Sequence, residues 1–521
     1  MKKSDDTTSL SGQLDLLITI LPFFCIVALC ALFVVSPEFS TRLLGAVRTF
    51  LGDELGSYYL LIGFGFFLCS LYLAFSRYGS IRLGEMEKPQ YSGFRWGAMM
   101  FTAGLAADIL FYSLCEWMLY ANEPHIEEMG GIQDWASTYP LFHWGPTPWA
   151  FYLVLSVAFG FMIHVRKRNK QKYSEACRAM LGGRTDGWAG RLIDLIAVFA
   201  LLAGTATTFS LATPLLSMAI SRVTGLVAST QLTIVILLVV CAIYTTSSYF
   251  GIRGIQLSAS CCMYLYFGLV VYVFLFGGEM RYILETGISA LGNLAQNFIV
   301  LSTWTDPLRT SSFPQNWTIF YWAYWMVWCV ATPFFIGSIS KGRTVRQVVL
   351  GGYAFGLSST FTSFIVLGNY GLGLQMHGRL DLLGAYAADG DLYGAIISLL
   401  GQLPLPGLVL VLLILCMFTL YSTSFDSITM VASSYSYKKL DHDGEPDRRV
   451  RLFWAVLLIL LPLALIFSEN SMTNLQTVSI IAAFPIGIII LMIVASFFKD
   501  AGAYLEEQRK QENEKNETKN N

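Results

Sequence analysis

The sequence predicts an all-α protein that crosses a membrane many times, and three observations support this fold class. Hydrophobic residues make up 55% of the 521 residues and charged residues only 13%, whereas a soluble domain carries about 25% charged residues. The mean hydropathy is +0.56. The apolar residues gather in runs of about 20, the length that an α-helix needs to span a bilayer. A soluble domain is therefore excluded, and nothing indicates a nucleic-acid partner.

Length and apolarity predict twelve spans. They lie at residues 14–35, 57–76, 94–121, 141–165, 188–220, 231–250, 258–279, 317–340, 345–372, 406–436, 451–468 and 477–497. Residues 281–303 have the pattern of an amphipathic helix that lies on the membrane surface between spans 7 and 8. A shorter helix of the same kind is predicted within residues 384–402.

The distribution of charge predicts the orientation of the chain in the plasma membrane. Lys and Arg gather in the loops after spans 2, 4, 8 and 10, whereas the loop at residues 121–140 has neither. Because basic loops stay in the cytoplasm, both termini are predicted to be cytoplasmic. The tail at residues 499–521 carries five basic and six acidic side chains. This balance predicts a disordered tail that does not grip anionic lipid strongly.

Two predicted spans contain helix-weakening sequences. Span 3 contains the stretch TAGLAAD at residues 102–108, and span 8 contains CVATPFF at residues 329–335, which includes Pro333. These spans stand five apart, as expected if spans 3–7 and 8–12 form two halves of inverted topology. Broken helices at matching places in two halves are typical of a transport site near the bilayer midplane. Close helix packing by small residues is the alternative explanation.

Asp108 lies inside apolar span 3, where a carboxylate costs about 2.5–3.5 kcal/mol on insertion scales. It could be the counter-charge of a cationic substrate, a proton-carrying or cation-coupling group, or a structural partner of Arg95 or Arg191. Those arginines lie near the cytoplasmic ends of their spans, which disfavours the third interpretation. Glu116 lies two turns farther along and is interpreted as an ordinary residue of the outer mouth.

Aromatic residues gather at the start of spans 4 and 8. On span 8, four of them fall on one helix face, with Trp325 at its edge; the four are Trp317, Tyr321, Tyr324 and Trp328. Trp144, Trp149 and Tyr152 lie close together in span 4. An interfacial belt would explain the outer rings but not those two or three turns inside span 8. The alternative is a cage for a quaternary ammonium group, which has no N–H to donate and is held by ring faces.

The stretches FHWGPTPWAFY at 142–152 and NWTIFYWAYWMVW at 316–328, with ISKGRTVR at 339–346, resemble the betaine/choline/carnitine transporter family, most closely a choline-type member. The resemblance implies a LeuT-type five-plus-five inverted repeat after two extra helices, a homotrimer and alternating access through a tryptophan box. The implied box is Trp144, Trp149, Tyr152 and Trp325, with Tyr324 beside it and Trp328 on the path. Trp317 and Tyr321 belong to the outer pathway. Tyr324 stands where the family usually has Trp.

This architecture divides the chain into six parts. They are the N-terminus (1–13), two extra helices (14–92), the first repeat (93–280), a connecting helix (281–316), the second repeat (317–497) and the C-terminal tail (498–521).

The expected activity is import of choline or a related trimethylammonium compound, with Asp108 among the substrate-binding residues. In relatives that carry betaine or carnitine this position is uncharged, since those substrates bring their own carboxylate. A glycine betaine, carnitine or γ-butyrobetaine transporter or exchanger is the first alternative. A membrane receptor for quaternary amines is an alternative of another class.

No cofactor is expected beyond a coupling ion, which is Na⁺ or H⁺. Sodium-coupled relatives have a Thr-Ser pair in span 10 that Thr423 and Ser424 match, facing Thr102 and Leu105 of span 3. The competing explanation is that these hydroxyls bond back to their own helix. The chain is not expected to be an enzyme, because only His143 and His164 lie in spans, more than 20 positions apart.

Overall fold

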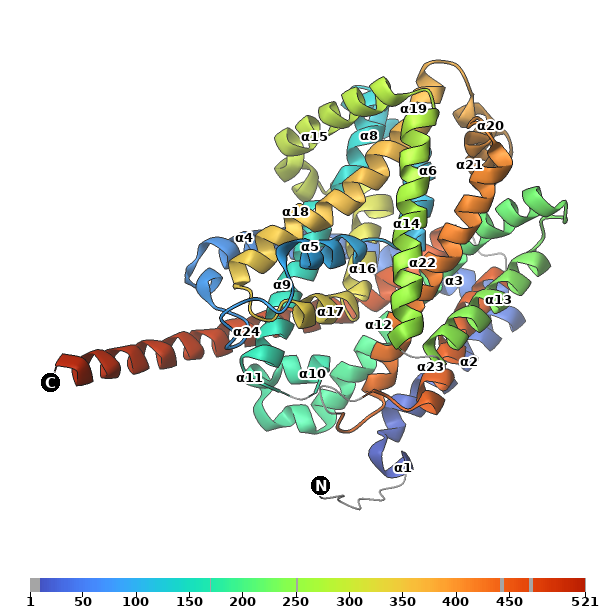
Figure 1. Cartoon of the computed structure of the whole chain (residues 1–521). Coiled ribbons are helices and arrows are strands. Elements are labelled where there is room, and N and C mark those ends of the chain that lie inside the picture. Colours follow the sequence, from blue (N-terminus) through green and yellow to red (C-terminus); the bar gives the residue numbers. More distant parts are fainter. Residues whose placement is uncertain (1–9, 169, 250–251, 441–444, 468–471, 521) are drawn as a thin grey trace.

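The computed structural model describes residues 10–168, 170–249, 252–440, 445–467 and 472–520 as a bundle of helices (Figure 1). Isolated β-bridges join Leu14 to Tyr437 and Arg82 to Thr344. The predicted all-α class is confirmed. Each of the twelve predicted spans coincides with a helix or with a bent pair of helices.

Within the described residues, eight helical segments are long and apolar enough to cross a membrane without a sharp bend. They are α2 (Leu16–Val35), α4 (Gly56–Phe75), α8 with α9 (Ile132–His143, Pro146–His164), α12 (Trp188–Thr224), α18 through η5 to α19 (Val345–Ser363, Phe364–Gly368, Asn369–Met376), α22 (Pro406–Tyr435), α23 (Arg448–Phe467) and α24 (Met472–Asn520). Helix α13 (Thr230–Tyr249) is also apolar, but its apolar stretch, Thr230–Thr246, is shorter than these eight segments.

Three further segments are bent pairs. In span 3, α5 (Gly93–Thr102) and α6 (Ala107–Ala121) meet at 64°, and in span 8, η4 with α16 (Pro314–Thr318, Ile319–Trp328) meets α17 (Thr332–Ile339) at 56°. The third pair is α14 (Ile252–Phe276) with α15 (Met280–Thr303), which meet at 109°. Both predicted breaks are therefore present, and α15 is the predicted helix between spans 7 and 8.

Short helices fill the connections. They are α1 (Leu10–Gln13), α3 (Pro37–Arg48), η1 (Thr49–Glu54), η2 (Arg77–Ser80), α7 (Pro124–Met129), α10 (Tyr173–Ala176), α11 (Arg178–Leu181), η3 (Gly182–Asp186), α20 (Leu382–Asp389) and α21 (Leu392–Leu400). The single helix predicted within 384–402 is two helices, because Gly390 ends α20 in the left-handed conformation at φ 70°.

The break in span 3 has a packing reason. A Cβ built on Gly104 would lie 2.7 Å from Cζ2 of Trp149, so only a glycine lets the chain pass this close to the indole. From Thr147 to His164 every residue of α9 is buried, as is every residue of α6 from Ala107 to Tyr120. These two helices form the centre of the bundle, and the candidate site lies between them and α16.

The tail does not match its prediction. Helix α24 continues without a break to Asn520, and its C-terminal part extends away from the bundle (Figure 1). Arg166 Nε lies 2.8 Å and Arg168 Nη2 2.6 Å from the Asp500 carboxylate, and Arg166 Nη1 lies 3.1 Å from Glu507. These ion pairs anchor the base of the tail and let the helix propagate from span 12, so the balanced charges do not produce disorder.

The two ends of the described chain share one face with the basic loops. Asp15, before α2, accepts a bond of 3.0 Å from Arg191 Nε, and its N–H donates to the carbonyl of Ser436. At the other end, α24 pairs with the segment after span 4, as described above. The structure therefore places both ends on the side of the loops after spans 4 and 10, and the assignment of that side to the cytoplasm remains a prediction.

Candidate functional site

The predicted box is a closed cluster of rings from spans 4 and 8. The ring centroid of Trp325 lies 5.6 Å from that of Trp144, 6.2 Å from that of Trp149 and 4.8 Å from that of Tyr152. Trp149 and Tyr152 lie 5.9 Å apart in an edge-to-face arrangement. Residues about 180 positions apart in sequence thus meet, and none of the four rings is more than 5% exposed. An interfacial belt is excluded for these four rings.

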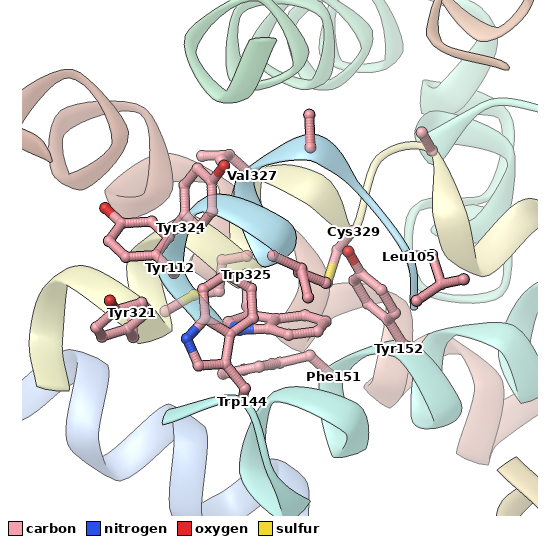
Figure 2. Close-up of a cluster of buried hydrophobic side chains, with 14 of the residues drawn as sticks. Leu105, Tyr112, Trp144, Phe151, Tyr152, Tyr321, Tyr324, Trp325, Val327 and Cys329 are labelled. Carbon is pink, nitrogen blue, oxygen red and sulfur yellow. The ribbon is translucent and has the colours of Figure 1, made fainter. Parts of the chain in front are cut away.

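Figure 2 shows how the box continues into its surroundings. Trp144 and Trp325 lie beside Tyr321 and Tyr112, whereas Tyr152 lies on the side of Leu105 and Cys329, where spans 3 and 8 are broken. The centroids of Tyr112 and Trp144 are 5.6 Å apart. No sequence pattern singles out Tyr112, because one tyrosine in an apolar helix has no periodic partner.

Asp108 lies in the first turn of α6, beside the box and 3% exposed. Its Oδ1 accepts the backbone N–H of Ile109 at 3.0 Å, and its Oδ2 accepts the hydroxyl of Tyr324. Thr208 of α12 shares a short hydrogen bond with the same hydroxyl. A helix N-terminus carries a partial positive charge and favours a carboxylate, which explains how this site tolerates one.

The suggested arginine partners of Asp108 are engaged elsewhere. Arg191 pairs with Asp15 at 3.0 Å, and the guanidinium of Arg95 lies over the Tyr91 ring at 5.4 Å. No ion pair of Asp108 occurs among the residues that the structure describes. The structural interpretation of Asp108 is therefore wrong for both arginines.

Tyr324 has a second role that the sequence interpretation missed. Its substitution for the usual Trp was considered only as a weaker ring, yet its hydroxyl is the side-chain group that holds Asp108. Trp328 contacts the Tyr324 ring edge-to-face at 6.4 Å and is half-buried, and its place on the path stays a prediction.

The two residues predicted for the outer pathway, Trp317 and Tyr321, lie on one side of the box. Tyr321 stacks on the His143 imidazole at 4.7 Å and contacts Trp144 at 5.4 Å. Trp317 lies farther out, where its indole N–H donates to Oε1 of Glu123 at 2.6 Å.

Glu116 is not the mouth residue that the sequence analysis assumed. It is fully buried, its Oε2 accepts the indole N–H of Trp144 at 2.7 Å, and its Oε1 accepts the hydroxyl of Tyr120. The presence of a carboxylate inside an apolar helix was the available indication, just as for Asp108. Glu116 was misassigned because the sequence does not show how deep the second half of the broken span lies.

The predicted cation-coupling residues make local hydrogen bonds. Thr423 Oγ1 donates to the carbonyls of Thr419 and Leu420 at 3.1 and 3.0 Å, and Thr102 Oγ1 donates to that of Met99 at 3.0 Å. Ser424 is half-buried, and Leu105 lies in the span 3 break, 8% exposed. A back-bonded hydroxyl keeps oxygen lone pairs, so the local bonds of Thr423 and Thr102 do not by themselves prevent either oxygen from binding a cation.

The box tryptophans differ in their polar contacts. Among the described residues, no acceptor contacts the buried indole N–H of Trp149, Trp325 or Trp328, whereas that of Trp144 is satisfied by Glu116. Buried donors normally have partners, so these three groups are available to a bound molecule or to water.

A bundle of apolar helices in which two broken spans surround a buried aromatic cluster is typical of a membrane transporter. The profile of the betaine/carnitine/choline family transporters matches residues 17–505, and the chain belongs to this family. It is therefore a transporter rather than an enzyme.

Three relatives illustrate the similarity. The carnitine transporter of Acinetobacter baumannii is 30% identical over 83% of this chain and 79% of its own length. The probable glycine betaine transporter of Desulfitobacterium hafniense is 31% identical over 89% and 92%, and the glycine betaine transporter OpuD of Bacillus subtilis is 28% identical over 92% and 93%.

Among solved structures, a Na⁺-coupled sialic acid symporter in a substrate-bound outward-open state aligns with a TM-score of 0.45. The alignment has 15% identity and covers 87% of this chain and 86% of that one.

Proposed function

We propose that the chain imports choline or a related trimethylammonium compound by alternating access through the aromatic box. The proposal depends on the surroundings of Asp108. Its carboxylate is buried, accepts a hydrogen bond from Tyr324 beside the box, and has no basic ion-pair partner among the described residues. A substrate with one positive charge and no carboxylate supplies the charge that this position lacks.

The two features recognise different parts of such a substrate. Ring faces attract a methylated ammonium group by about 0.5–2 kcal/mol each when water is excluded. A carboxylate adds a long-range attraction that grows as the local dielectric falls. Trp144, Trp149, Tyr152 and Trp325 would surround the ammonium group, and Asp108 would compensate its charge from one side.

Coupling to Na⁺ is part of this proposal. The ligands would come from Thr423 and Ser424 of α22 and from Thr102 and Leu105 at the span 3 break, because hydroxyl and freed backbone oxygens suit a small hard cation. Proton symport and exchange are the other outcomes of the coupling test. Replacing Na⁺ by K⁺ at two pH values during choline uptake separates all three.

The surroundings of the protein are proposed from the family and the charge pattern. They are a homotrimer in the lipid of the plasma membrane, with both termini in the cytoplasm. The two inverted repeats would be residues 93–280 and 317–497, joined by the connecting helix at 281–316.

The substrate test uses purified protein in proteoliposomes with an imposed Na⁺ gradient and radiolabelled choline. Choline should accumulate, glycine betaine should compete weakly, and Asp108→Gly should abolish choline accumulation. Intact choline uptake in Asp108→Gly contradicts the counter-charge role. Accumulation of betaine but not of choline contradicts the choice of substrate.

A betaine or carnitine substrate is the second candidate, and a specific observation favours it. The unsatisfied indole N–H groups of Trp149, Trp325 and Trp328 are donors that a substrate carboxylate could occupy. The relatives named as carnitine and glycine betaine transporters agree with this alternative. In that case Asp108→Gly should leave uptake intact or improve it, because a fixed carboxylate would repel that of the substrate.

A further inference from the structure

Glu116 ends a chain of hydrogen bonds that joins spans 3, 4 and 8. Nδ1 of His143 lies 2.6 Å from the Tyr120 oxygen, and Nε2 of the same ring lies 3.0 Å from Oγ1 of Thr318. Tyr120 has one hydroxyl proton, which it gives to Glu116. His143 then donates from Nδ1 to Tyr120 and contacts the Thr318 hydroxyl at Nε2, so every group in the chain has a hydrogen-bond partner.

The second oxygen of Glu116 is directed at the box. It accepts the indole N–H of Trp144 at 2.7 Å, a charge-assisted hydrogen bond across span 3 to span 4. Trp144 lies at the joint between α8 and α9, where its backbone is not helical, with φ −112° and ψ 18°. The helix itself therefore does not set the orientation of this side chain.

Other contacts fix Trp144 only in part. Thr360 donates to its carbonyl at 2.9 Å, and Phe364 stacks on its ring at 5.4 Å with 27° between the planes. The rings of Tyr112, Tyr321 and Trp325 also pack against the indole, but none of these contacts gives its N–H an acceptor. Glu116 supplies that acceptor, and among the described residues neither Trp149 nor Trp325 has such a bond.

We propose that Glu116 is a positioning residue of the substrate site, which orients Trp144 through its indole N–H so that the ring contributes to the cage. It does not touch the substrate. The inference rests on the proposed function in one respect: Trp144 must form part of the cage that binds a trimethylammonium group.

The test is a double-mutant cycle on transport in proteoliposomes. Glu116→Gln should raise KM for choline about ten-fold with little change in kcat, because an uncharged amide oxygen accepts the indole N–H less strongly than a carboxylate oxygen does. Trp144→Phe keeps an aromatic ring but removes the N–H. In a Trp144→Phe background, Glu116→Gln should therefore cause no further rise in KM.

Two outcomes overturn the proposal. One is an unchanged KM in Glu116→Gln. The other is a rise of the same size with and without the indole N–H, which would mean that Glu116 acts on stability alone. Glu116→Asp is the second variant if Glu116→Gln does not fold: it keeps the charge but is one methylene too short for Trp144, and it should follow the same pattern.

Glu279→Gln is the matched control. Glu279 is also a buried carboxylate, but it pairs with His377 and Arg379 at 2.9 and 3.1 Å, at the junction of α14 and α15. Its removal should leave the KM for choline unchanged. If choline is not transported, the same cycle is run with glycine betaine, so the proposed function can fail while the positioning role is still decided.

Discussion

Helix α6 carries two buried carboxylates, and their surroundings differ in one respect that matters. Glu116 has a histidine imidazole 3.9 Å away, whereas Asp108, two turns earlier, has no potentially cationic side chain paired with it in the described part of the chain. Both have donors on each oxygen: Tyr120 and Trp144 for Glu116, and Tyr324 and a backbone N–H for Asp108.

The difference indicates separate roles for two residues of the same chemical class. Glu116 belongs to a hydrogen-bond chain that is complete within the protein, so its function is to hold its neighbours in place. Asp108 has its hydrogen bonds but no histidine or other basic side chain beside it among the described residues, and a lone charge is costly at this depth. A cationic substrate would supply the missing partner of Asp108, whereas Glu116 already ends a hydrogen-bond chain within the protein.

The largest expected effect separates charge from shape at Asp108. Asp108→Asn should weaken choline binding about 100-fold, because a buried carboxylate–cation attraction is worth 2–5 kcal/mol. The neutral isostere 3,3-dimethylbutan-1-ol should lose little affinity as a competitor of uptake. Equal losses for both compounds would show that Asp108 only shapes the site, as Glu116 is proposed to do.

A smaller effect is expected from the tyrosine that holds Asp108. Tyr324→Phe keeps the ring of the cage but removes the hydroxyl that donates to the carboxylate. The KM for choline should rise about ten-fold, the cost of one hydrogen bond to a charged group. In an Asp108→Asn background the substitution should matter much less, and additive losses measured by uptake would contradict this connection.

The smallest effect is expected at Asp500, a carboxylate paired with arginines outside the spans. Asp500→Asn removes two partly exposed ion pairs, with Arg166 and Arg168. Such pairs contribute about 0–1 kcal/mol each, so thermal unfolding should shift by only a few degrees. The KM for choline should stay as in the unmodified protein. A changed KM would connect the tail helix to the transport site.

Much of the fold was predictable because the bilayer imposes it. Runs of about 20 apolar residues must become helices there, since every backbone N–H and C=O has to be bonded within the segment. The two breaks were readable from Gly104 and Pro333, which weaken a helix locally. The continuation of α24 to its end could not be read from the sequence, because Asp500 gains its arginine partners only when the segment after span 4 lies beside it.

The site was predictable only in its ring content. Helical periodicity placed Trp325 and Tyr324 close to one face of span 8. It could not show that this face meets the aromatic residues of span 4, which the box requires. The hydrogen bond of Tyr324 to Asp108 depends on the direction that helix α6 takes after the break in span 3. The bond of Glu116 to Trp144 depends on the same direction, and no local sequence pattern encodes it.

The sequence alone determined that this chain is a helical membrane protein with interrupted spans, aromatic rings in spans 4 and 8 and two acids in span 3. These properties follow from composition and period, which are local. Only the tertiary structure decided that Glu116 joins a hydrogen-bond chain that runs to His143 and Thr318, while Asp108 has no histidine or other basic side chain beside it among the described residues. Ion pairs and hydrogen bonds form over about 3 Å, and residues hundreds of positions apart reach that distance only after the helices have packed.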